Sequence, residues 1–250
     1  HLLAKAGLFW LAGAVGRFDI ERWSDLAGNR LVLSVLAVLV VAIAGLPPFP
    51  GFWAKWELVM QAADGGKSVW IAVILIGSLL EAAYMFRWFK HATRPHAAAD
   101  RSAETDLPLA SLAPALGAAV LLFAAGFVAA SSAGAASLWL FAPLYVGGAL
   151  FLLDALPGRV KCGLMLAAVA LCGAWIIRDI TGLRALFAVL LLAGGVVVAF
   201  AGLYRSDARR GFHAMMAVLV LSIAALFRAD TGLEFFFHWE IITLSSYFLI

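Results

Sequence analysis

The sequence predicts an all-α protein, a polytopic bundle of transmembrane helices with about nine membrane segments. Of its 250 residues, 64% are hydrophobic and only 13% are charged, whereas soluble domains carry about 25% charged residues. Its apolar runs approach the roughly 20 residues that a helix needs to cross a bilayer. They lack the two-residue alternation of barrel strands. One of these segments is expected to be broken at residues 45–51.

The expected segments follow one another along the whole chain, separated by short polar stretches. The first and the last are expected to be truncated, because the chain starts and stops inside apolar patterns. The segments are residues 1–16, 31–63 (which contains the break), 68–89, 109–130, 138–156, 162–178, 185–204, 211–228 and 233–250.

The basic residues indicate how these segments are oriented. If the broken segment crosses once, the stretches 17–30, 90–108, 157–161 and 205–210 lie on one side of the membrane. That side carries Arg17, Arg22, Arg30, Arg87, Lys90, Arg94, Arg101, Arg159, Lys161, Arg205, Arg209 and Arg210, and the other side carries only Lys67, Arg178, Arg184 and Arg228. Cytoplasmic loops are enriched in Lys and Arg, so the first side is predicted to be cytoplasmic.

A few ionisable residues fall inside the apolar runs, where a charge costs roughly 2.5–3.5 kcal/mol on insertion scales. Such residues usually face a bundle interior or a wet cavity, and they are candidates for proton translocation. They are Lys5, Lys55, Glu57, Glu81 and Glu240, with His1 and His238 as further candidates.

Lys55 is the strongest candidate, because it directly follows the break in the segment 31–63. Gly45, Pro47, Pro48, Pro50 and Gly51 interrupt the run. Proline removes backbone donors and glycine permits unusual backbone angles, so the helix is expected to open there. Discontinuous membrane helices build ion sites in transporters. Lys55 is expected in the first turn of the second half-helix, near its positive dipole end, where burial and the dipole both disfavour the charged form.

The other candidates carry weaker signals. His1 and Lys5 are four residues apart and so share a helix face, which suits proton transfer along the helix. Glu81 lies midway along its run. Three roles are considered for it: a counter-ion for a buried lysine, a relay group, or one partner of a purely structural ion pair. Glu240 lies inside the last run, and Glu57 points to a different face from Lys55.

Other kinds of chemistry have no signature in the sequence. Cys162 and Cys172 share one apolar run without a second metal-binding pair, and are expected to be buried small hydrophobes. No catalytic triad or phosphate-binding glycine loop occurs, so neither a catalytic site, a metal site nor a cofactor is expected in this chain.

Two motifs carry a family resemblance. "HLLAKAGLFWLAGAV" followed by "AIAGLPPFPGFWAKWELV" resembles the antiporter-like, proton-translocating membrane subunits of respiratory complex I, Mrp-type Na⁺/H⁺ antiporters and membrane-bound hydrogenases. The later stretch "LEFFFHWEIITLSSYFLI" resembles an early part of such a subunit, where a Trp-Glu pair carries a membrane glutamate. The resemblance implies proton-translocating roles for Lys55, for His1 and Lys5 on the preceding relay helix, and for Glu240.

The order of these motifs is inverted relative to the family, because the Trp-Glu glutamate follows the broken helix here. The favoured interpretation is a fusion of two modules. Residues 1–130 would be the C-terminal part of a first module, 131–137 an extracytoplasmic linker, and 138–250 the first five helices of a second module. A circularly permuted single module is the alternative.

The resemblance implies a proton-translocating subunit of a complex I-like redox pump in a prokaryotic inner (cytoplasmic) membrane. Its expected partners are other membrane subunits of a complex I-like or Mrp-like assembly, the lipid bilayer and H⁺, and no nucleic acid is expected. The alternative is a subunit of a Mrp-type Na⁺/H⁺ antiporter without redox chemistry, for which Na⁺ is also a transported ion. A scaffold without an ion path is the third interpretation.

Overall fold

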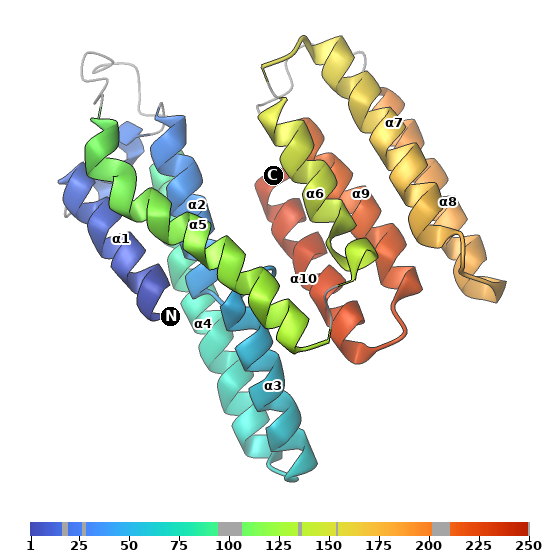
Figure 1. Ribbon diagram of the computed structural model, residues 1–250, viewed down its shortest axis with the longest axis horizontal. Helices are drawn as coiled ribbons and strands as arrows, with labels where there is room; N and C mark the ends of the chain where they lie inside the picture. Colours follow the sequence, from blue (N-terminus) through green and yellow to red (C-terminus); the bar gives the residue numbers. More distant parts are fainter. Residues whose placement is uncertain are drawn as a thin grey trace. The chain divides into compact units, whose positions relative to one another are not determined.

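The computed structural model describes residues 1–16, 20–26, 29–94, 107–134, 137–153, 155–201 and 211–249. Within these ranges the chain forms ten α-helices and one short 3₁₀-helix, which confirms the all-α prediction. The helices group into two compact units, His1–Gly134 and Ala135–Ile250. Figure 1 shows the helices of each unit, coloured from blue to red along the chain.

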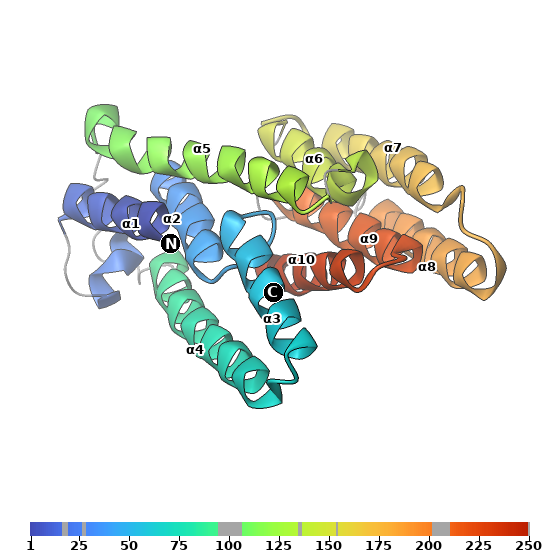
Figure 2. The ribbon, with the colours of Figure 1, turned by 60° about the horizontal axis from the view of Figure 1, so that its bottom comes forward.

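The first unit is built around a helix that is interrupted and then resumes. Its helices α1 and α2 both pack against α5, while α3 packs against α4 and α5. Figure 2 shows α3 and α4 joined by a tight turn at their ends. The elements are α1 (Leu2–Val15), η1 (Ile20–Leu26), α2 (Arg30–Ile43), α3 (Pro50–Asp64), α4 (Ser68–Thr93) and α5 (Leu109–Ser132).

The second unit is organised around α9, which contacts each of the other four helices of the unit. This central position explains why α9 buries about half of its residues, including the polar His213 and Ser222. Its core joins side chains of α6, α7 and α9, among them Met165, Ile176 and Leu221. The elements are α6 (Leu138–Leu152), α7 (Gly158–Ile177), α8 (Gly182–Ala201), α9 (Phe212–Arg228) and α10 (Gly232–Leu249).

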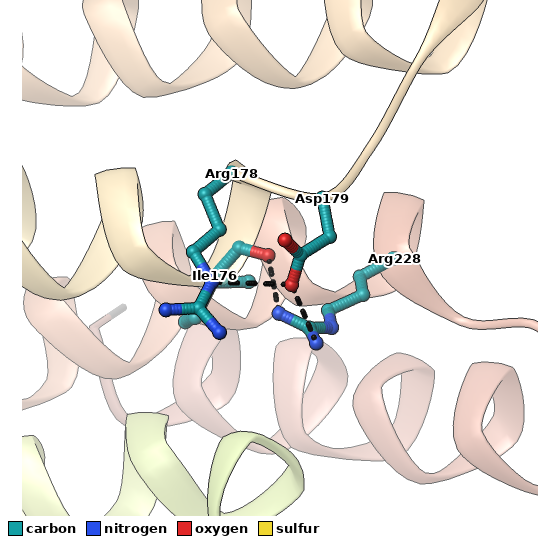
Figure 3. A network of polar contacts seen from close by, with 4 residues as sticks. All are labelled: Ile176, Arg178, Asp179 and Arg228. Atoms are coloured by element: carbon teal, nitrogen blue, oxygen red, sulfur yellow. Dashed lines mark hydrogen bonds and ion pairs between the residues drawn. The ribbon is translucent and has the colours of Figure 1, made fainter.

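Charged side chains hold one end of the second unit together (Figure 3). Arg228 at the end of α9 donates a hydrogen bond of 2.9 Å to the carbonyl of Ile176 in the last turn of α7. Its other terminal nitrogen lies 3.3 Å from a carboxylate oxygen of Asp179, which also accepts from Arg178 at 3.2 Å. Arg228 thus satisfies a carbonyl that the helix end leaves without an intrahelical partner.

Three helices in the described part of the chain are long and apolar enough to cross a membrane: Ser68–Thr93, Leu109–Ser132 and Gly158–Ile177. The remaining apolar helices are shorter, for example 14 residues in α1, or about 21 Å at 1.5 Å per residue. The expected total of about nine membrane segments is therefore not confirmed, although the helical class is.

Several predicted boundaries change. The expected loop 157–161 is mostly helical, because α7 begins at Gly158. The expected linker 131–137 begins inside α5, which continues to Ser132. The stretch 205–210, and parts of 17–30, 90–108 and the linker, lie outside the described residues.

Candidate functional site

The chain leaves the helix after Ile43, within the stretch where the sequence predicts a break. Gly45 has φ +67°, a left-handed conformation that glycine adopts without strain. Its N–H donates to the carbonyl of Ala42, and the N–H of Leu46 donates to that of Val41, both at 3.2 Å. These two bonds form a Schellman motif, so the end of α2 is a defined stop rather than a kink.

The next helix, α3, begins at Pro50, which occupies its first position. Proline is favoured there because its missing N–H would have no intrahelical partner. Pro50 and Gly51, expected within the break at 45–51, are therefore already helical. The non-helical stretch is shorter than predicted and lies between Ile43 and Pro50.

Lys55 extends from α3 back to the end of α2. Its ammonium nitrogen, Nζ, lies 2.7 Å from the carbonyl oxygen of Ala44, the C-cap residue of α2. The lysine stem passes over Gly45, where an added Cβ would lie 2.6 Å from both Cε and Nζ. Since side chains of a helix tilt toward its N-terminus, Lys55 in the second turn of α3 can span the break.

This placement corrects the expected electrostatics of Lys55. The sequence analysis put the lysine in the first turn of α3, beside the positive end of that half-helix. The ammonium instead contacts the C-terminal carbonyl of α2, which is the negative end of a helix dipole and favours a cation. Lys55 lies on the second half-helix, α3, as predicted, but in its second turn rather than its first. Its length lets the ammonium reach past the N-terminus of α3 to the end of α2.

Glu81 on α4 is the second partner of Lys55. Its Oε2 lies 3.6 Å from Nζ of Lys55, and the two side chains are 30% and 23% exposed. At this distance the two groups form an ion pair rather than a hydrogen bond. This ion pair fits both the counter-ion role and the purely structural role considered for Glu81, and its function in transport stays a prediction.

The break is held against α5 by close packing. An added Cβ at Gly126 would lie 2.3 Å from the carbonyl oxygen of Pro48, so only glycine allows this approach. The indole of Trp53 donates to the same carbonyl at 3.3 Å. Phe49 and Phe123 pack with ring centroids 4.9 Å apart and planes inclined by 54°. These contacts fix the non-helical backbone, which in turn positions Ala44 and Lys55.

The remaining candidates are not brought to this site. His1 and Lys5 are exposed on α1, which packs against α2 and α5. No described side chain pairs with the Lys5 ammonium. Glu240 lies half-buried on α10 in the second unit, and Glu57 is exposed on α3, where it accepts a hydrogen bond from Gln61.

Two parts of the site were missed by sequence reasoning: the carbonyl of Ala44 and the close approach at Gly126. A helix that ends at membrane depth leaves carbonyls without partners, so a nearby cation could have been expected to bind one. No sequence pattern marks Gly126 for its contact with Pro48. Among the described residues, no group of three or more His, Cys, Asp or Glu side chains is placed to hold a metal ion.

The fold and the interrupted helix define a helical integral membrane protein with a charged pair beside the interruption. Residues 1–81 match the family model described as "NADH:quinone oxidoreductase/Mrp antiporter, TM". This region covers α1 to α3 and the first half of α4, with Lys55 and Glu81. The resemblance to the antiporter-like family of complex I and Mrp-type proteins is confirmed there.

Curated relatives carry related names. The chain is 35% identical over 133 residues to a NADH-quinone oxidoreductase subunit N of Desulforudis audaxviator, covering 46% of this chain and 26% of that protein. It is 36% identical over 106 residues to a F(420)H(2) dehydrogenase subunit N of Methanosarcina mazei, covering 36% and 21%. The aligned part of the chain thus spans only about a fifth to a quarter of the length of these relatives. No solved structure matches significantly.

Proposed function

We propose that this chain is part of a proton-translocating membrane subunit of a complex I-like redox-driven pump, of the NADH:quinone oxidoreductase or membrane-bound hydrogenase type. The contact of Lys55 with the carbonyl of Ala44 and with Glu81 at the interrupted helix carries the proposal. The names of the curated relatives, a NADH-quinone oxidoreductase subunit N and a F(420)H(2) dehydrogenase subunit N, support the redox assignment.

The pair gives the lysine two electrostatic settings. With Glu81 near, the opposite charge stabilises the ammonium. When the carboxylate is neutralised or moves away, this stabilisation of the ammonium is lost. A shift of charge elsewhere in the complex would then make Lys55 release its proton to internal water. Lys5, His1 and Glu240 are proposed as further relay groups, and broken-helix residues Gly45, Pro47, Pro48, Pro50 and Gly51 as the frame.

The proposal is tested by replacing Lys55 in the full-length protein, within its assembled complex in lipid vesicles. The measured quantity is the number of protons moved per electron pair. Lys55→Met should abolish most proton movement through this subunit. Lys90→Met, which removes an exposed cation near the end of the neighbouring α4, should leave the ratio unchanged.

Lys55→Arg separates a proton relay from a structural cap. Arginine keeps the charge and can donate to the Ala44 carbonyl, but it does not deprotonate in proteins. The variant should therefore assemble normally and still fail to move protons. Full transport by Lys55→Arg or by Lys55→Met would contradict the proposal and favour a scaffold.

The alternative is a Mrp-type antiporter subunit, since the matching family model is described by both names. The two functions differ in their driving force. Proton movement that requires an electron donor and acceptor supports the redox pump. Proton movement that follows an imposed Na⁺ gradient without redox substrates supports the antiporter.

The proposed partners are other membrane subunits of such an assembly, with H⁺ as the transported ion. The proposed location is the inner membrane of a prokaryote, with 17–30, 90–108, 157–161 and 205–210 on the cytoplasmic side. The interpretation of 1–130 and 138–250 as parts of two fused modules also remains a proposal.

A further inference from the structure

His238 is a fully buried polar residue in the second unit, with 0% exposure on α10. Its imidazole lies beside Trp139 of α6, with ring centroids 5.6 Å apart and planes inclined by 31°. Its neighbour Phe237 makes an edge contact with Phe141, also on α6, with ring centroids 5.3 Å apart. The ring is therefore enclosed where α6 meets α10.

Neither ring nitrogen of His238 has a hydrogen-bond partner among the described residues. A neutral imidazole carries one N–H donor and one acceptor nitrogen, on different edges of the ring. Leaving a buried donor or acceptor unsatisfied costs about 1–3 kcal/mol each, and native interiors contain few such groups. The two ring nitrogens of His238 therefore need polar partners that the described residues do not supply.

Ser222 on α9 is a second group of this kind, with a fully buried hydroxyl that likewise lacks a partner among the described residues. It lies at the same depth as His238. The helices α9 and α10 are antiparallel neighbours joined by a short connection at Asp230. Ser222 and His238 lie equally far along the chain from Asp230, or about 12 Å along the helix axes.

Trp139 also contacts Arg228, which lies at the end of α9. The guanidinium carbon of Arg228 lies 5.1 Å from the centroid of the Trp139 ring. Arg228 also lines a pocket of about 250 Å³ together with Asp179, Thr181, Arg184 and Asp230. Trp139 thus contacts both a residue of this polar pocket and the buried imidazole.

We propose that His238 and Ser222 bind internal water in the second unit, and that this water enters from the Arg228 pocket past Trp139. At least two molecules are needed, because one water cannot reach both edges of the imidazole. One accepts from the ring N–H and the other donates to the second nitrogen, while Ser222 bonds to one of them. Water with two or more polar partners is a stable part of protein interiors. The site would hold water whether or not the subunit moves protons.

The test uses the full chain in lipid, with ¹⁵N-labelled histidine, and measures magnetisation transfer from water to the ring nitrogens by solid-state NMR. The chain has five histidines, and His238→Phe assigns the signal of interest. We expect transfer to His238 despite its complete burial, and loss of much of this transfer in Ser222→Ala. A ring without transfer would overturn the proposal, and an unchanged signal in Ser222→Ala would remove Ser222 from the site.

The route is tested by two matched aromatic truncations on α6. Trp139→Ala removes the side chain that contacts both His238 and Arg228, and should speed the exchange of water at His238 several-fold. Phe141→Ala removes a buried ring that makes an edge contact with Phe237 instead, and should leave the exchange rate unchanged. Equal acceleration in both variants would indicate general loosening of α6 and contradict entry past Trp139.

Discussion

At the scale of single residues, the geometry of the site depends on one long side chain, that of Lys55, which reaches back across the non-helical stretch before α3. Lys55 lies on α3, but its ammonium donates a hydrogen bond to the carbonyl of Ala44 at the end of α2. Hydrogen bonds that involve a charged group contribute about 1.5–3 kcal/mol. The contact therefore stabilises the break while placing a titratable group in it.

Gly45→Ala is expected to displace Lys55. The new Cβ would meet Cε and Nζ of the lysine at 2.6 Å, at a residue with φ +67°. Gly66→Ala is a matched control, because Gly66 has φ +66° but nothing within 4 Å. Both variants pay about 1–2 kcal/mol for the left-handed backbone. Only Gly45→Ala should also lower the proton-to-electron ratio, and equal ratios in the two variants would argue against a role for the lysine's position.

Glu81→Gln is expected to destabilise the first unit and to impair transport, because it removes the counter-ion of Lys55. A double-mutant cycle with Lys55→Met, followed by thermal unfolding in detergent, measures the pair. We expect a coupling free energy of about 0.5–3 kcal/mol. Additive effects of the two substitutions would show that the ion pair contributes nothing.

At the scale of elements, the break is fixed by α5 as much as by its own prolines. Gly126→Ala would place a methyl group 2.3 Å from the carbonyl oxygen of Pro48. Overpacking of this kind costs about 1–3 kcal/mol. Gly117→Ala on the same helix meets nothing within 4 Å and should be neutral or stabilising. Thermal unfolding of both variants compares them directly, and equal melting temperatures would mean that α5 does not hold the break.

The start of α10 has a local pattern that is readable in the sequence. Glu234 accepts from the backbone N–H of Thr231, and Thr231 accepts from that of Glu234. This is a capping box. Local patterns of this kind are readable because both partners lie within one turn of each other.

The candidate site was predictable only in part. The glycines and prolines before Lys55 predict an interrupted helix, because their backbone properties are local. The acceptor for Lys55 depends on the Schellman motif that turns the chain, and the distance to Glu81 depends on how α4 packs. Such long-range geometry has no signature in a single sequence, which is why the contact of Lys55 with the end of α2 was not predicted.

At the scale of the whole molecule, composition predicts the helical membrane class, but apolar runs do not fix how many helices span. The run 31–63 becomes two helices of 14 and 15 residues. A count from apolar runs cannot distinguish a single crossing from two half-helices. Hence the class is confirmed and the number of segments is not.

The division into His1–Gly134 and Ala135–Ile250 predicts that the two parts fold separately. Co-expression of residues 1–134 and 135–250 as two chains should give two helical proteins that insert into membranes. Circular dichroism measures the helix content of each purified chain, and limited proteolysis measures its compactness. The undivided chain is the reference for both measurements. Aggregation or loss of helicity in either chain would show that the units depend on a continuous backbone.

The vibration of the Ala44 carbonyl can report the charge of Lys55, because the ammonium donates a hydrogen bond to this oxygen. A neutral amine still carries N–H groups, so Lys55 can keep its bond to this oxygen after giving up a proton, while its attraction to Glu81 disappears. The bond would then weaken without breaking. Labelling this single carbonyl with ¹³C would let infrared difference spectra follow the charge of the lysine during turnover, as a shift in one vibrational band.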